Sequence, residues 1–343
     1  MAVNVVSFDM SRPDDLSVLS AYLHSVDALR VRRLALLLRV AGEYEDGTRE
    51  AARAAVEALL DGFSLAHRAA FITVVGAEGA STPSGFALVD LDEAVRSAGE
   101  PRLAIGITLA APPPEPSIGT VQFASDLRAM VAAAVDDGGM DVNDVQLVIV
   151  NVPMAASGHV GIRSRQGRAA AALAAGMALG EISESDVTAD RIMNDASLFT
   201  SRVQTFTGPA IRQIEIIVIG NSRTAGGDLF ACNTVTQDLL DTRSIRRMLK
   251  MAGLQMDEDG ELDTGCLVAT VAKYGVSPDG VIAGAPTTVC SSAMPPEKHI
   301  RAALSGVLGA TLHTTRVLST YDPVHQAPPG GGTLCCIIRK PHP

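Results

Sequence analysis

Ser222 is the residue whose position most clearly suggests a chemical role. It closes the run EIIVIGNS, which begins at Glu215 and is typical of a buried strand because Ile and Val pack well on a pleated surface. Gly220 marks the end of that strand, since glycine adopts backbone angles that other residues avoid. The hydroxyl of Ser222 would then stand at an open strand end, and we predict that it is a nucleophile. The alternative is a serine that only caps a turn.

Lys273 is the candidate base. The sequence contains four lysines, of which Lys250, Lys298 and Lys340 lie in segments that read as exposed. Lys273 instead belongs to the apolar run CLVATVAKY, where burial would lower its pKa and favour the neutral amine that a base needs. A lysine that reaches from a strand end into solvent is the alternative interpretation.

The elements that must position these side chains repeat along the chain. We expect strands at 34–40, 70–75, 103–109, 145–152, 215–222, 266–274, 311–320 and 334–338, and helices at 15–32, 48–60, 121–135, 167–179, 238–252 and 298–308. The pattern restarts twice, at a spacing too long for a solenoid. It predicts an α+β fold of three related sheet-plus-helix units, at 1–102, 103–253 and 254–343, around a pseudo-threefold axis. Equivalent strand ends would then converge on a shared central active site.

Composition excludes several classes of function. The net charge is −10 and aromatic residues make up 3% of the chain, which argues against nucleic acid and anionic membrane as partners. The five cysteines are odd in number and show no CxxC spacing, so we expect neither a disulfide framework nor a zinc site. The N-terminal segment has no apolar core of a signal peptide, and no run is long enough to span a bilayer. We therefore expect a cytoplasmic protein.

Several stretches, in collinear order over essentially the whole chain, resemble the ring-opening amidohydrolases, the group of cyanuric acid amidohydrolase and barbiturase. They are LAIGITL, AGMALGEI, NDASLF, EIIVIGNS, VAKYGVSPDG, KHIRAAL and HQAPPGGG. The resemblance implies three related units with a central site, in which a serine attacks the carbonyl of a cyclic imide or amide. It also implies one Ser-Lys pair and one ring-clamping arginine per unit, and a homotetramer.

Carrying the pairs over residue by residue shows departures from that pattern. In the second unit the serine is Ser222, after Gly220 and Asn221, while the lysine position holds Asn151 and the arginine is Arg168. In the first unit the pair falls on Gly42 and Val74, and the arginine is Arg53.

The third unit has a candidate for each member of the pair. Lys273 matches its lysine, and the serine falls at Ser319 or Thr320. Its arginine falls at Pro286, and a glutamate that helps to hold a structural metal in the family falls at Gly275.

The first hypothesis is a hydrolase of a small heterocycle with a cyclic amide or imide. Ser222 attacks the ring carbonyl, Lys273 is base or charge stabiliser, and strand-end amides hold the oxyanion. The predicted substrate contacts are Arg53, Arg168, Asn151, Gly76, Gly220, Asn221, Ser319 and Thr320. We expect no cofactor, although a structural cation near the PPGGG loop is an open alternative.

The second hypothesis is a relative that binds a heterocycle or catalyses ring closure, dehydration or isomerisation on the same scaffold, because fold alone does not fix function. A purely structural protein without a ligand is the third.

Overall fold

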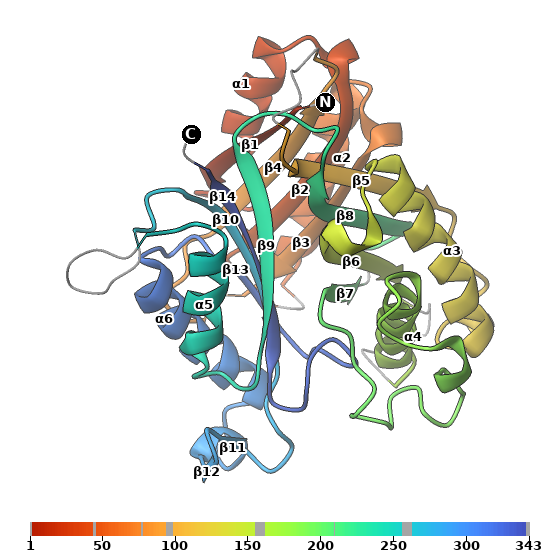
Figure 1. The fold of residues 1–343 in the computed structure, drawn as a ribbon, viewed down its shortest axis with the longest axis vertical. Helices are drawn as coiled ribbons and strands as arrows, with labels where there is room; N and C mark the ends of the chain where they lie inside the picture. The colour runs from red at the N-terminus through yellow and green to blue at the C-terminus, as the bar shows by residue number, and fades with distance from the viewer. Residues whose placement is uncertain are drawn as a thin grey trace.

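The structure is a computed structural model of the chain that describes residues 2–43, 46–76, 78–93, 99–154, 162–208, 210–255 and 263–340. Within these ranges the strands form three four-stranded sheets and a two-stranded ribbon (Figure 1). If the strands of each large sheet are numbered along the chain, their order across the sheet is first, fourth, second, third. The second and third strands run parallel, and the fourth is antiparallel to both of its neighbours. This confirms the predicted α+β fold of three related units.

Each unit follows the order strand, helix, strand, helix, strand, strand. The first unit contains β1 (Ala2–Asp9), α1 (Ser17–Ser25), β2 (Val31–Val40), α2 (Thr48–Gly62), β3 (Ala69–Val75) and β4 (Ser84–Leu91). The second contains β5 (Arg102–Ala110), α3 (Val121–Asp137), β6 (Val145–Pro153), α4 (Ile162–Ala178), β7 (Val203–Gly208) and β8 (Ile214–Ser222). The third contains β9 (Leu229–Thr236), α5 (Thr242–Met251), β10 (Leu267–Tyr274), α6 (Pro296–Leu312), β13 (Leu318–Tyr321) and β14 (Gly332–Arg339).

Shorter elements connect these. The ribbon of β11 (Val281–Ile282) and β12 (Ala285–Pro286) lies in the third unit, before α6. The 3₁₀ turns are η1 (Ala28–Arg30), η2 (Ala66–Arg68), η3 (Glu115–Ser117), η4 (Val142–Asp144), η5 (Glu184–Asp186) and η6 (Thr288–Cys290).

Sheet pairing moves one of the predicted unit boundaries. β9 pairs with β14, so it belongs to the third sheet, and α5 packs with α6 in the same helical layer. The second unit therefore passes into the third between Ser222 and Leu229, whereas the sequence pattern placed that boundary at 253. The reason is that β9 pairs with a strand about a hundred residues later in the chain, which a local pattern does not reveal.

The core has a central part and three peripheral parts. Alternate residues of each strand face inward, so Leu37 of β2, Ile149 of β6 and Val271 of β10 share one cluster between the three sheets. The opposite face of each sheet packs on its own helices. Figure 1 shows α3 and α4 on one side of the molecule and α5 and α6 on the other, with α1 at the top. This arrangement brings the inward faces of three sheets to one centre.

The helices have local reasons to form. In α2 the buried residues Ala52, Val56 and Leu60 recur every four positions, which gives the helix one apolar face. In α3 the hydroxyl of Thr120 caps the first turn by accepting from the backbone N–H of Phe123. None of the helices in the described ranges is long and apolar enough to cross a membrane.

Candidate functional site

A cavity of about 480 Å³ lies where the three units meet. Its described lining comprises Arg49, Val74 and Val75 from the first unit, Arg168, Thr205, Phe206 and Thr207 from the second, and Lys273, Glu297, Arg301, Thr320, Tyr321 and Asp322 from the third. A larger cavity of about 650 Å³ takes its described lining from the first and third units and contains no lysine. We therefore regard the first, which we call the central cavity, as the candidate site.

Strand register identifies three equivalent pairs of residues at this centre. On the parallel second and third strands of each sheet, Arg39 pairs with Val74, Asn151 with Phe206, and Lys273 with Thr320. In each strand these residues continue the inward-facing alternation of the central core. Only the last pair combines an amine with a hydroxyl.

The inner member of each pair reaches into another unit. Arg39 Nη1 donates to the carbonyl of Ser319 at 3.0 Å, Asn151 Nδ2 donates to that of Phe71 at 2.8 Å, and Lys273 Nζ donates to that of Thr205. The first unit thus bonds to the third, the third to the second, and the second to the first. We call this cycle the three-unit relay, and it shows that the three repeats do meet around one axis.

Lys273 is the buried amine of the cavity, with a side chain that is almost fully inaccessible to water. Burial, followed by repulsion from Arg168, holds the pKa of Lys273 well below 10.5, and the opposing attraction of Asp322 is weaker. Its Nζ lies 4.6 Å from the centre of the Phe206 ring. The shift favours the neutral amine, which is the form that can accept a proton.

Thr320 is the hydroxyl beside it. Direct pairing on parallel strands places Thr320 and Lys273 on the same face of the sheet as neighbours. Thr320 Oγ1 is buried and finds no hydrogen-bond partner among the described residues, and the same holds for Thr207 Oγ1. Because buried polar atoms are almost always paired, these two hydroxyls mark places where a ligand would bind.

Arg168 is the predicted arginine that does line the cavity. Its Nη2 lies 2.6 Å from Asp322 Oδ2 and its Nη1 donates to the Asp322 carbonyl, while Arg165 binds the same carboxylate at 3.1 Å. Asp322 adopts a left-handed backbone (φ 67°), which is uncommon for non-glycine residues but more accessible to aspartate than to most. The two arginines keep the pKa of Asp322 below its usual value despite burial.

Ser222 does not belong to this site, and the prediction that it is the nucleophile is wrong on geometry. It lies seven positions from Glu215, about 23 Å along β8 at the usual rise per residue, and Glu215 is the residue at the central end. Its side chain also faces the helical layer, because it shares the parity of Val218 and not that of Ile219. Its hydroxyl donates to the carbonyl of Gly139 at 2.6 Å.

Gly220 and Asn221 share the remote end of β8 and serve packing, not substrate binding. A Cβ on Gly220 would lie 2.6 Å from the carbonyl of Asp144, so this position must be glycine for close approach. The Asn221 amide binds the edge strand β9 like a backbone unit: Nδ2 donates to the Ala231 carbonyl and Oδ1 accepts from the Ala231 N–H, each at 2.9 Å.

Arg53 and Asn151 also differ from their predicted roles as substrate contacts. Both bind the buried carboxylate of Glu215, with Arg53 Nη2 at 3.0 Å and Asn151 Nδ2 at 2.7 Å. The guanidinium of Arg53 also lies 4.1 Å from the centre of the Phe71 ring. Asn151, the second unit's equivalent of Lys273, is therefore engaged with a buried ion pair between Arg53 and Glu215. A small void of about 40 Å³, lined in part by Arg53 and Asn151, remains beside it.

Ser319 and Gly76 lie near the cavity but not among its described lining. Ser319 Oγ accepts from Arg39 at 2.6 Å, so its hydroxyl is occupied. Gly76 bonds to the carbonyl of Val40, and a Cβ there would crowd Glu78 Oε2 at 2.9 Å. Arg39, rather than Gly42, is the first unit's equivalent of Lys273.

Sequence reasoning missed Phe206, Arg301 and Asp322 as lining residues. Arg301 Nη1 donates to the Val75 carbonyl at 3.2 Å and approaches Glu78. Aligning the third strands of the units by register would have found Phe206, since it occupies the position of Thr320. Asp322 could have been inferred from its place directly after that strand.

The HQAPPGGG segment holds β7, one of the strands that line the central cavity. Gln326 Oε1 accepts from the Thr205 N–H at 2.9 Å, and Gln326 Nε2 donates to Thr205 Oγ1 at 3.0 Å, which fixes β7 where Lys273 binds it. The described residues contain no group of three His, Cys, Asp or Glu side chains that could hold a metal ion. Gly275 stands at the family's metal-binding glutamate, so a structural cation at this loop stays an untested alternative.

Comparisons with known proteins agree with this geometry. A family profile described as "Amidohydrolase ring-opening protein" matches residues 4–339. The chain is 29% identical over 283 residues to a cyanuric acid amidohydrolase of Pseudonocardia dioxanivorans, which covers 77% of this chain and 78% of the relative. It is 26% identical over 366 residues to a cyclic amide hydrolase of Azorhizobium caulinodans, which covers 99% and 100%.

Two solved structures of cyanuric acid hydrolases have the same fold. One, from A. caulinodans, superposes with a TM-score of 0.86 at 25% identity and covers 99% of both chains. The other, at 24% identity, gives a TM-score of 0.87 over 98% of this chain and 99% of that one.

Proposed function

Because the match over residues 4–339 shows that the chain belongs to the family of ring-opening amidohydrolases, we propose that it hydrolyses a C–N bond of a small cyclic amide or imide in the central cavity. The observation that carries this proposal is the pairing of Lys273 with Thr320 on adjacent parallel strands. It is the one of the three register-equivalent pairs that retains both a base and a hydroxyl.

Thr320 takes the nucleophilic role that the sequence assigned to Ser222. A hydroxyl becomes a nucleophile when an adjacent base removes its proton, and the neutral amine of Lys273 is that base. Thr320 Oγ1 attacks the ring carbonyl carbon and its proton passes to Lys273 Nζ. The ring C–N bond then breaks, and the Lys273 ammonium returns the proton to the leaving nitrogen.

The second half of the reaction releases the product. Water attacks the ester on Thr320, Lys273 accepts the water proton, and Thr320 leaves with that proton as the ring-opened carboxylate departs. Arg168 and Arg301 supply positive charge for the substrate oxygens, and Asp322 fixes Arg168. Arg168 is nearly buried and thereby suited to a fixed contact.

Substitutions at Thr320 and Lys273, with a control at Ser222, test this mechanism. We expect Thr320→Val and Lys273→Met each to lower kcat by about 10²- to 10⁴-fold, the range for a lost acid–base partner, and Thr320→Ser to retain turnover. Ser222→Ala is the matched control, because it removes a hydroxyl far from the cavity, and it should keep wild-type turnover. Turnover that survives in Thr320→Val but not in Ser222→Ala would reject the assignment.

A non-hydrolytic reaction is the second candidate, favoured by the replacement of two pairs by Arg39–Val74 and Asn151–Phe206. The two candidates differ in mass balance. Hydrolysis adds one water to the ring and transfers ¹⁸O from labelled solvent into the new carboxylate, whereas ring closure, dehydration or isomerisation does not. Mass spectrometry of the product distinguishes them.

We further propose that the reaction needs no cofactor, and that the active form is a cytoplasmic homotetramer. Turnover should survive treatment with a chelator, and light scattering coupled to size-exclusion chromatography should report four times the chain mass of 35.6 kDa.

A further inference from the structure

The central cavity has two chemically different walls. Threefold repetition would allow each unit to present the same polar pair to a bound ring. Instead, the third-strand position is Val74 in the first unit, Phe206 in the second and Thr320 in the third. Two of the three positions therefore carry hydrocarbon side chains, and both line the cavity.

The partners of Val74 and Phe206 do not restore polarity at these positions. Arg39 is turned toward Ser319 and the Glu78 carbonyl, and Asn151 is bound to the Phe71 carbonyl and to Glu215. Neither belongs to the described lining of the central cavity. Most charged lining groups belong to the third unit, which contributes Lys273, Glu297, Arg301 and Asp322. Arg168 of the second unit binds Asp322, and Arg49 is the charged lining residue of the first unit.

A bound ring must satisfy both walls. An amide edge directed at Lys273 and Thr320 finds an amine and a free hydroxyl. A carbonyl or ring N–H directed at Val74 or Phe206 would lose its water without gaining a partner, which is costly for a buried polar group. A carbon edge at the same place gains contact with both hydrocarbon side chains.

We propose that the substrate is a cyclic imide with carbon atoms, not heteroatoms, on the ring edge opposite its scissile amide, and that Val74 and Phe206 select it. The reaction class rests on the proposed function, but the selection concerns binding and can be tested without turnover. A ring with amides on every edge is disfavoured because the amides that face Val74 and Phe206 find no hydrogen-bond partner in those two side chains.

Three six-membered rings of similar size form the test series. Glutarimide has one imide edge and three ring carbons opposite it, barbituric acid has heteroatoms on more of its edges, and cyanuric acid has amides all round. We expect glutarimide to bind at least about tenfold more tightly than cyanuric acid, measured by calorimetry with the full chain. Phe206→Ser should reduce or reverse that ratio, and Val74→Ser should act in the same direction.

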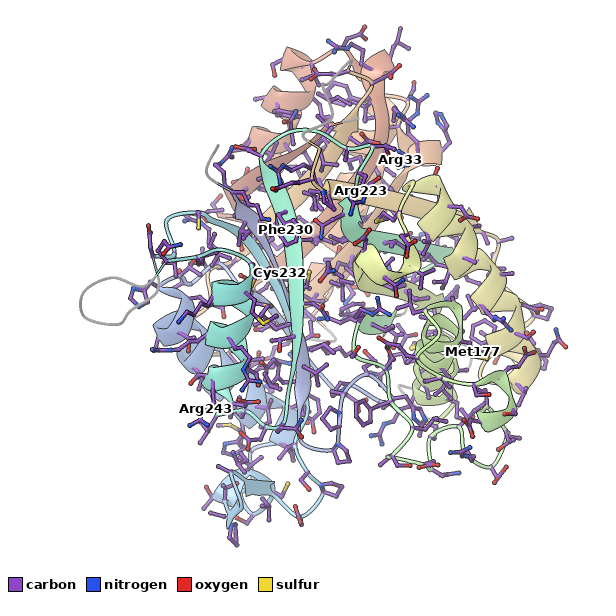
Figure 2. All side chains as sticks on the ribbon, in the orientation of Figure 1. Arg33, Met177, Arg223, Phe230, Cys232 and Arg243 are labelled. Atoms are coloured by element: carbon purple, nitrogen blue, oxygen red, sulfur yellow. The ribbon has the colours of Figure 1, made fainter. Side chains whose placement is uncertain are left out.

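Phe230→Ser is the matched control. Phe230 lies on β9 (Figure 2), and its ring lies 4.0 Å below Lys340 Nζ, as Phe206 lies below Lys273. It lines a different cavity, so its loss should leave the ratio between the rings unchanged. Circular dichroism of each variant establishes that the fold is retained.

The outcomes separate the two proposals. Tighter binding of glutarimide that Phe206→Ser abolishes, without hydrolysis of any ring, would support the selection and overturn the proposed hydrolysis. Equal or tighter binding of cyanuric acid, or no binding of glutarimide, would overturn the selection whatever the turnover. A preference that persists in both serine variants would overturn the role of these two residues.

Discussion

Replacing Lys273 with methionine should inactivate the protein and stabilise it at the same time. The lysine side chain is buried in the fold, and its pKa is held well below 10.5 by burial and then by Arg168. Methionine has nearly the same length and no proton to lose. The variant therefore removes the base while it also removes the cost of burying an amine that would be charged in the unfolded chain.

The sign of the pH dependence follows from proton counting. Between the folded pKa of Lys273 and 10.5, the unfolded chain carries one proton more than the folded chain. The free energy of unfolding of the wild type therefore gains a contribution of up to about 1.4 kcal/mol for each unit of rising pH in that window. Lys273→Met lacks this contribution, so its stability advantage should shrink as the pH rises and level off below the folded pKa.

Urea denaturation of both proteins at a series of pH values measures this difference. Subtracting the two curves of unfolding free energy against pH cancels the contribution of every titrating group that the substitution leaves unchanged. Lys298→Met is the matched control, because Lys298 is only half-buried and is bound to Glu43 at 3.0 Å, and its curve should run parallel to the wild type. Parallel curves for Lys273→Met as well would mean that Lys273 is charged in the fold, which would refute its role as a neutral base.

Other substitutions test the contacts that replaced the predicted site roles. Glu215→Ala should cost about 3–5 kcal/mol of unfolding free energy, because it leaves the Arg53 charge buried without its main partner, and a change under 1 kcal/mol would contradict this. Asn221→Ala should cost about 1–3 kcal/mol of unfolding free energy through the two hydrogen bonds lost at Ala231, measured by urea titration, and an unchanged midpoint would count against a stabilising role for these bonds. Gly220→Ala should lower the free energy of unfolding by about 1–3 kcal/mol through its clash with the Asp144 carbonyl, seen as a lower urea midpoint, and should leave the KM of any substrate unchanged.

The repeat could be predicted from the sequence because each unit contains strongly patterned segments such as LALLLRV and EIIVIGNS. Weaker strands were missed. β9 has the mixed sequence LFACNTVT, and its pairing partner β14 lies about a hundred residues later in the chain. The end of α6 was also predicted too early. The helix was expected to end at 308 but runs to Leu312, so the strand predicted at 311–320 is shorter and spans Leu318–Tyr321. Pairing at long range is decided by tertiary packing, which local patterns do not encode.

The candidate site was predicted in part. Lys273, Thr320 and Arg168 were predicted as site residues, and all three line the central cavity. The prediction for Ser222 was wrong because a strand has two ends and two faces, and an apolar run does not indicate which end of the strand lies at the axis. A shift of one residue turns a side chain to the other face, so Ser222 faces α3 although Asn221 faces inward.

The three-unit relay also bears on how the protein unfolds. Each bond begins in one unit and ends in another, so the cycle has no free end from which opening could begin. A unit that detaches breaks two of the three inter-unit hydrogen bonds at once and exposes the inward faces of both neighbouring units to water. The three repeats should therefore melt together in one cooperative transition, in contrast to linear repeat arrays that fray from their termini.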